Sequence, residues 1–340
     1  MRSHEPSQRL RIFTTCPMSS TDEQSACVRR IENVARWSED AGCEGILVFS
    51  DNRQLDVWLV AQVIINGTKN LSPLVAVQPA YMHPYAVAKM IATFAFMHGR
   101  RVYLNMVAGG FKNDLLALDD PTPHDERYNR LIEYTTVITR LCTESRVSFE
   151  GRYYRVKNLS LMPRIPPALV PGVLNSGSSE AGQAAARELS SIAIEYPKPS
   201  AEYGGESSAS DLSRGIRIGL ITRETHADAW AVAHARFPED RKGQLAHKLA
   251  MQVSDSAWHK QLSDRDPAES DRDPYWLVPF QNYKAMCPYL VGSYECVASE
   301  IARYVNSGYR TFILDEPVSA LEMQHVAAAF DRAQRRSAAA

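Results

Sequence analysis

Net charge is almost absent from the 340-residue chain, because 38 lysines and arginines offset 39 aspartates and glutamates. The basic field with which proteins bind nucleic-acid phosphates is therefore missing, and no nucleic-acid partner is expected. The six cysteines include no C-x-x-C pair, so neither a metal site nor a disulfide scaffold is predicted. A signal-peptide apolar core is missing, and the longest uncharged stretch, residues 70–88, contains three prolines. We therefore expect a cytoplasmic protein without a membrane partner.

Several catalytic signatures are also missing. Gly177 and Gly182 have the spacing of a P-loop, but Gln183 stands where the lysine of that loop would be. The chain contains neither the G-x-S-x-G of serine hydrolases nor the H-E-x-x-H of zinc proteases. Nucleotide hydrolysis through a P-loop and these two hydrolytic chemistries are therefore not expected.

What the sequence does contain is an alternation of short apolar runs with helical patterns, which is typical of parallel βα units. The predicted strands are residues 10–15, 45–50, 74–78, 101–107, 172–175, 191–195, 215–222 and 311–315. Eight such units predict an α/β protein, a (β/α)8 TIM barrel occupying residues 1–340 as one domain. Residues 147–159 read as an added hairpin, and residues 236–289 as a long insertion before the eighth strand. That insertion is predicted to be a mobile lid or, equally well, a solvated loop.

The carboxyl ends of barrel strands carry the chemistry in this fold, and the end of the fifth predicted strand has the most informative sequence. Gly177, Ser178 and Ser179 lie between that strand and an alanine-rich helix that starts at Glu180. Backbone N–H groups and hydroxyls at a helix N-terminus can bind a phosphate without a lysine. Simple capping of the helix by a serine explains the pattern equally well, so the residues alone leave both interpretations open.

A set of ordered motifs resembles the bacterial luciferase-like flavin monooxygenases, and most of all their alkanesulfonate monooxygenase branch. The motifs are residues 104–110, 124–128, 149–153, 177–181, 290–292 and 311–314. The resemblance implies a TIM barrel that binds reduced FMN at the carboxyl ends of its strands and uses O2. It also implies a partner NAD(P)H:flavin reductase that supplies the reduced FMN, and a homodimer or homotetramer.

The resemblance also assigns cofactor-binding residues, which fall into three groups. The FMN phosphate would be held by Gly177, Ser178 and Ser179 with the help of Tyr128. Asn105 and His124 would contact the flavin, and Ala76 and Gln78 would line its ring.

Departures from the alkanesulfonate branch bear on the substrate. Gln54 replaces a cysteine of that branch, and in the seventh strand Arg217 persists while Gly219 replaces a histidine. An aromatic run that includes Trp276 and Tyr283 replaces an arginine- and glycine-rich lid. We therefore expect Arg217, Gln54 and Trp276 as catalytic residues and a substrate other than a simple alkanesulfonate. An ion pair with Glu195 is the structural alternative for Arg217.

The function implied is oxygenation of a small organic or carrier-protein-bound substrate in secondary metabolism. Three alternatives remain open on the sequence. One is an F420- or flavin-dependent oxidoreductase without oxygenation, and another is a non-catalytic flavin-binding homologue. The third is a glycosidase-like barrel that pairs Glu195 with Asp315 or Glu316.

Overall fold

The computed structural model describes residues 9–19, 24–109, 112–203, 212–253, 262–263, 271–272 and 274–338. Within these residues, eight parallel strands pair in the order β1-β2-β3-β4-β7-β8-β9-β13, and β13 pairs with β1 to close the barrel. They are β1 (Arg11–Thr15), β2 (Gly45–Val48), β3 (Ser72–Val77), β4 (Tyr103–Val107), β7 (Gly172–Ser176), β8 (Ile192–Glu195), β9 (Arg214–Arg223) and β13 (Tyr309–Leu314). The predicted TIM barrel is therefore confirmed, and every predicted strand is present.

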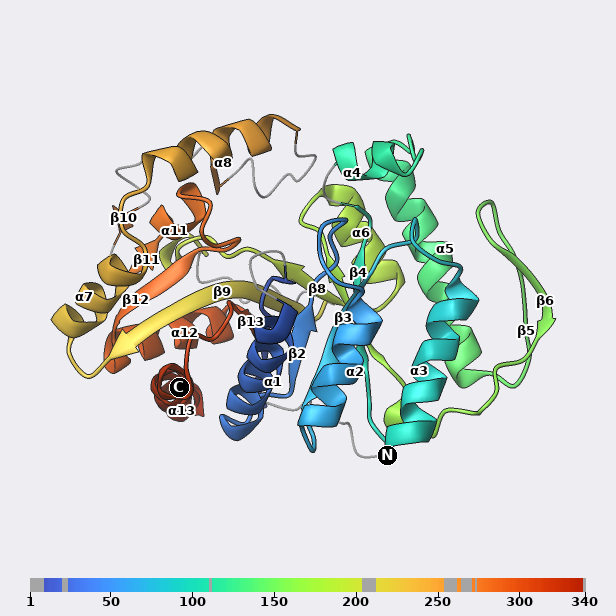
Figure 1. Cartoon of the computed structure of the whole chain (residues 1–340), viewed down its shortest axis with the longest axis horizontal. Coiled ribbons are helices and arrows are strands. Elements are labelled where there is room, and N and C mark those ends of the chain that lie inside the picture. Colours follow the sequence, from blue (N-terminus) through green and yellow to red (C-terminus); the bar gives the residue numbers. More distant parts are fainter. Residues whose placement is uncertain are drawn as a thin grey trace.

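Helices surround the barrel as the βα pattern requires (Figure 1). They are α1 (Gln24–Asp40), α2 (Val57–Gly67), α3 (Pro84–His98), α4 (Lys112–Ala117), α5 (His124–Thr143), α6 (Glu180–Glu188), α7 (His226–Arg236), α8 (Arg241–Val253), α11 (Val278–Gln281), α12 (Tyr294–Asn306) and α13 (Ala320–Ala338). Local sequence sets several boundaries: α3 begins at Pro84 and ends at Gly99, whose φ of 61° is left-handed. None of the described helices is long and apolar enough to cross a membrane.

The barrel interior is filled by large side chains from neighbouring strands. Phe13, Leu47, Leu74, Tyr103, Leu174, Ile194 and Ile313 form this cluster. Along β9, Ile216 and Ile218 pack outward in a second core, so the alternation of a strand turns Arg217 and Gly219 toward the interior. The middle of the barrel interior is thus apolar, and polar side chains lie at the carboxyl ends of the strands.

Two parts of the architecture were not predicted. A ninth parallel strand, β12 (Tyr289–Ser293), pairs with the outer edge of β9, and β11 (Tyr275–Trp276) and β10 (Asp271–Arg272) extend the sheet from it. Helix α4, between β4 and α5, is the second part that was not predicted. The predicted hairpin is present as β5 (Val147–Glu150) and β6 (Arg155–Leu159). Figure 1 shows α4 and α8 on the side of the barrel at which β2 and β3 end.

Candidate active site

A cavity of about 680 Å³ opens at the carboxyl ends of the barrel strands. It is lined by residues from all eight of them and from the insertion, which is the usual position of a barrel active site. Ten of the residues predicted from sequence lie on its wall. They are Gln54, Ala76, Gln78, Asn105, His124, Tyr128, Gly177, Ser178, Ser179 and Arg217. The structure therefore brings residues that are far apart in sequence to one surface.

The turn between β7 and α6 forms a concave cradle on this wall. Ser179 caps α6, because its Oγ accepts a hydrogen bond from the Gly182 N–H at 3.1 Å. Asn175 steadies the same turn from below, where its Nδ2 donates to the Gly182 carbonyl at 2.8 Å. Capping thus accounts for Ser179, but it does not account for Ser178.

The Ser178 hydroxyl is buried and has no hydrogen-bond partner within the described part of the chain. Such a group is costly unless a ligand satisfies it. A Cβ on Gly177 would lie 2.3 Å from the Tyr128 hydroxyl, so only glycine leaves room for this tyrosine. Burial raises the pKa of Tyr128, although a hydrogen bond with Ser179 opposes the rise, so the phenol remains a neutral donor. The cradle therefore fits a phosphate group.

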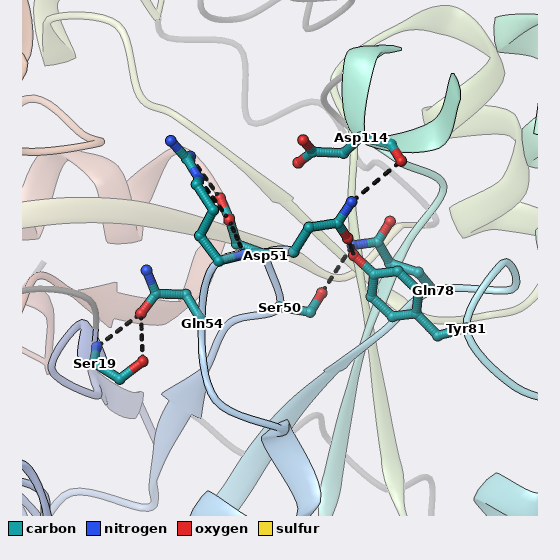
Figure 2. A network of polar contacts seen from close by, with 9 residues as sticks. Ser19, Ser50, Asp51, Gln54, Gln78, Tyr81 and Asp114 are labelled. Carbon is teal, nitrogen blue, oxygen red and sulfur yellow. Dashed lines mark hydrogen bonds and ion pairs between the residues drawn. The ribbon is translucent and has the colours of Figure 1, made fainter. Parts of the chain in front are cut away.

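Polar groups on the neighbouring wall come from β3, β4 and β7. The Ser176 hydroxyl donates to Asn105 Oδ1 at 2.8 Å, which leaves the amide nitrogen of this buried asparagine for a ligand. Gln78 Nε2 donates to Ser50 Oγ at 2.9 Å and to the Tyr81 hydroxyl at 3.2 Å (Figure 2). The Gln78 amide is consequently held in one orientation at the end of β3.

Gln54 belongs to a separate contact in the loop that follows β2. Its Oε1 accepts hydrogen bonds from the backbone N–H and the hydroxyl of Ser19, at 2.7 and 2.9 Å (Figure 2). The side chain therefore joins the loops after β1 and β2 at the cavity rim. A role in positioning these loops fits this geometry, and a catalytic role for Gln54 stays a prediction.

Arg217 projects from β9 into the cavity. Its buried Nε has no hydrogen-bond partner among the described residues. Burial alone would lower its pKa, but Tyr196, Cys287 and Asp315 together raise the pKa above the usual value, so the guanidinium stays charged. The alternative ion pair with Glu195 is wrong, because Glu195 pairs with Arg214 at 2.8 Å.

Trp276 lies away from the cavity. It is 1% exposed and packs against the rings of Trp230, His234 and Phe237, with centroids 5.4 to 6.0 Å apart. The aromatic run was expected to face the substrate, but β11 pairs with β12 and turns this ring into the core of the insertion. That placement does not fit a catalytic role for Trp276. Tyr283, from the same run, does line the cavity.

The glycosidase alternative also fails on geometry. Glu195 is held by Arg214 and Tyr309 and is not part of the cavity wall, whereas Asp315 and Glu316 are. Two carboxyl groups facing one cleft are required for that chemistry. The proposed pairing of Glu195 with either residue is therefore absent.

Sequence reasoning missed several residues that the insertion contributes to the wall. They are Arg236, Phe237, Lys284, Ala285, Met286 and Tyr289. The signal for Tyr289 was the apolar run at residues 290–292, which together with Tyr289 belongs to β12 in the structure. Lys284 forms an ion pair with Asp240 at 2.8 Å, and Arg236 forms one with Glu322 at 3.1 Å.

The departure at Gly219 has a clear structural counterpart. Tyr289 stands directly opposite Gly219 on the neighbouring strand, and a Cβ on Gly219 would lie 2.3 Å from the tyrosine ring. The ring crosses β9 at this glycine, and its hydroxyl donates to Asp315 Oδ2 at 2.6 Å on the far side. Tyr289 and Asp315 thus lie beside Gly219, the position at which the alkanesulfonate branch has a histidine.

Fold and site together define a barrel with a cradle that holds an unpartnered, buried hydroxyl beside a large, mixed polar and apolar cavity. The chain belongs to the luciferase-like monooxygenase family, whose profile matches residues 9–311. It is therefore a monooxygenase of this group. Luciferase-like monooxygenases use a reduced flavin, so its cofactor is of the flavin type.

Individual relatives share the sequence or the fold of this chain. The chain is 32% identical over 299 residues to 4-(gamma-L-glutamylamino)butanoyl-[BtrI acyl-carrier protein] monooxygenase BtrO of Niallia circulans, covering 86% of this chain and 87% of that protein. The fold is shared with EDTA monooxygenase EmoA from Chelativorans sp. BNC1, at 14% identity and a TM-score of 0.73, covering 97% and 94% of the two chains. It is also shared with the coenzyme F420-dependent tetrahydromethanopterin reductase from Methanopyrus kandleri, at 13% identity and a TM-score of 0.65, covering 96% and 99%.

Proposed function

We propose that the chain is the oxygenase component of a two-component system that uses reduced FMN and O2. A separate NAD(P)H:flavin reductase supplies the reduced FMN, and the substrate is an acyl group carried on a carrier protein. The carrier-bound substrate is suggested by the relative BtrO, whose name specifies an acyl-carrier protein. Reduced FMN, when bound, supplies two electrons, so that one atom of O2 enters the substrate and the other leaves as water.

The observation that carries this proposal is the cradle of Gly177, Ser178 and Tyr128. A phosphate there would receive the orphaned Ser178 hydroxyl, the Tyr128 hydroxyl and backbone N–H groups at the start of α6. F420 also carries phosphate, so the choice of flavin rests on the luciferase-like monooxygenase family to which the chain belongs. FMN is therefore the proposed flavin.

The remaining residues of the wall orient the flavin and exclude water. Gln78 and Asn105, each fixed by a hydrogen bond, present amide groups where a flavin ring extending from the cradle would lie. Leu47, Ile194 and Ile313 form an apolar floor beneath that position. A dry, preorganised surface of this kind protects a reactive reduced flavin from side reactions with water.

The cradle is tested by comparing reduced FMN with reduced riboflavin, which lacks the phosphate, in anaerobic titrations. We expect Ser178→Ala to weaken the binding of reduced FMN about tenfold, because one hydrogen bond to a charged group is lost. Binding of reduced riboflavin should not change. Ser213→Ala, at an exposed serine just before β9, is the matched control and should leave both affinities unchanged. Equal FMN affinity in Ser178→Ala and the wild type would place the phosphate elsewhere.

A further inference from the structure

Most charged side chains on the cavity wall are neutralised by a partner within the protein. The pairs are Arg30 with Glu316, Arg53 with Asp51, Arg236 with Glu322, and Lys284 with Asp240. Asp114, which lies beside Asp51 and Arg53, forms no ion pair within the described residues. The four ion pairs therefore contribute little net charge to the interior of the cavity.

Two charges on the opposite wall, like Asp114, have no ion pair within the described residues, but unlike Asp114 they carry opposite signs and lie together. Arg217 on β9 and Asp315, just after β13, both line the cavity, and neither has an ion-pair partner in the part of the chain that the structure describes. Their strands are adjacent, with Arg217 in register with Ile313, so the two groups lie on the same side of the barrel mouth. They attract each other enough to affect the pKa of Arg217, but they do not form a salt bridge. The guanidinium has a hydrogen bond with Tyr196, an uncharged partner that leaves its positive charge and its Nε available to a ligand.

Asp315 is held in place by Tyr289. The tyrosine hydroxyl donates to Oδ2 at 2.6 Å, which leaves Oδ1 for another donor. Burial and the charge of Asp315 raise the pKa of Tyr289 well above its usual value, so the phenol stays protonated and keeps this hydrogen bond at neutral pH. The absence of a side chain at Gly219 gives the ring its path across β9.

Unpaired charges in a partly desolvated cavity are unfavourable unless a ligand neutralises them. A cation and an anion that face one space, yet do not pair, match a ligand group that itself carries both charges. We propose that Arg217 and Asp315 form a subsite for the zwitterionic α-amino-acid head group of the substrate, its carboxylate on Arg217 and its ammonium on Asp315. This inference deepens the proposed function, because it names the chemical class of the acyl group.

The subsite agrees with the chemistry of the relative's named substrate. A γ-glutamyl group is attached through its side-chain carboxyl, so its α-ammonium and α-carboxylate are both free. A ligand of this kind would satisfy the orphaned Arg217 Nε and the second Asp315 oxygen together. Arg217 would then act mainly in substrate binding and specificity, and Tyr289 as a positioning residue for Asp315.

The test uses three compounds that differ by one charged group, titrated calorimetrically into the full-length chain. The parent is 4-(γ-L-glutamylamino)butanoic acid. The second, 4-(glutarylamino)butanoic acid, lacks the α-ammonium, and the third, 4-(4-aminobutanoylamino)butanoic acid, lacks the α-carboxylate. We expect the wild type to bind the parent at least about tenfold more tightly than either analogue, because each lost group removes a charge-assisted hydrogen bond.

The variants assign each preference to one residue. Asp315→Asn should lose the preference for the ammonium, and Arg217→Gln the preference for the carboxylate, each while keeping the other. Tyr289→Phe should reduce the ammonium preference about threefold without changing the carboxylate preference, because only the position of Asp315 is affected. Asp114→Asn, at the other unpaired carboxylate of the wall, is the matched control and should keep both preferences.

A wild type that binds the three compounds equally would overturn the inference, as would an Asp315→Asn variant that still discriminates the ammonium. Binding is measured without turnover, so the two proposals fail separately. Selective binding without oxygenation would support the subsite and contradict the proposed function. Oxygenation of thioesters of all three acyl groups with equal kcat/KM would support the proposed function and contradict the subsite.

Discussion

Replacing Gly177 by valine is expected to weaken the binding of reduced FMN roughly 100-fold, because overpacking at a buried site costs up to about 3 kcal/mol. A Cβ here would lie 2.3 Å from the Tyr128 hydroxyl, and Tyr128 is only 7% exposed and cannot turn into solvent. Anaerobic titration with reduced FMN measures the loss. Gly67→Ala is the matched control, since the nearest atom to its new Cβ is 3.6 Å away.

A double variant separates this clash from general damage to the fold. Gly177→Ala should lose affinity by the same mechanism, and Tyr128→Phe should lose a phosphate donor. Removing the hydroxyl also removes the closest atom to the new Cβ, so the two losses should not add in the double variant. Strict additivity would show that Tyr128 and Gly177 do not share one site.

Replacing Gly219 by leucine is expected to lower the free energy of unfolding by about 2 kcal/mol, since the barrel interior cannot absorb the added atoms. It should also reduce kcat/KM by about two orders of magnitude, because the Tyr289 ring must leave the position from which it holds Asp315. Urea unfolding and steady-state turnover measure the two effects.

The companion variant for this prediction is Gly219→Ala combined with Tyr289→Ala. Removing the ring removes the atoms that a Cβ at position 219 would meet, so the double variant should be more stable than the sum of the single changes predicts. A stable Gly219→Leu protein with normal turnover would mean that Tyr289 has no part in the site.

The barrel was predictable because each of its strands carries a local signal. Buried parallel strands are continuous apolar runs, and helix ends such as Pro84 and Gly99 mark the segments between them. The signal weakened after residue 236, where the chain leaves the βα repeat. There β12 is only five residues long and runs directly into α12, so no strand was predicted at this place.

The cradle of the site was predictable for a similar reason, since a Gly-Ser-Ser turn before a helix is a local pattern. The arrangement of the opposite wall was not predictable, because it depends on a contact that spans the three strands β12, β9 and β13. Tyr289, Gly219 and Asp315 are separated by up to 96 residues, and only the strand order β12-β9-β13 brings them together. Trp276 was predicted to be a catalytic residue but lies in the core of the insertion. Aromatic composition does not tell which face of a short strand is buried.

Incorporation of oxygen-18 tests the central claim most directly. The full-length chain is supplied with a flavin reductase, FMN, NADH, oxygen-18 gas and the proposed kind of substrate. The probe is 4-(γ-L-glutamylamino)butanoate bound as a thioester to BtrI, the acyl-carrier protein in the name of the relative BtrO. Mass spectrometry of the acyl group should show the gain of one oxygen-18 atom, and omission of FMN, reductase or enzyme should abolish it. NADH oxidation without any labelled product, or an oxygen that comes from water, would contradict the account.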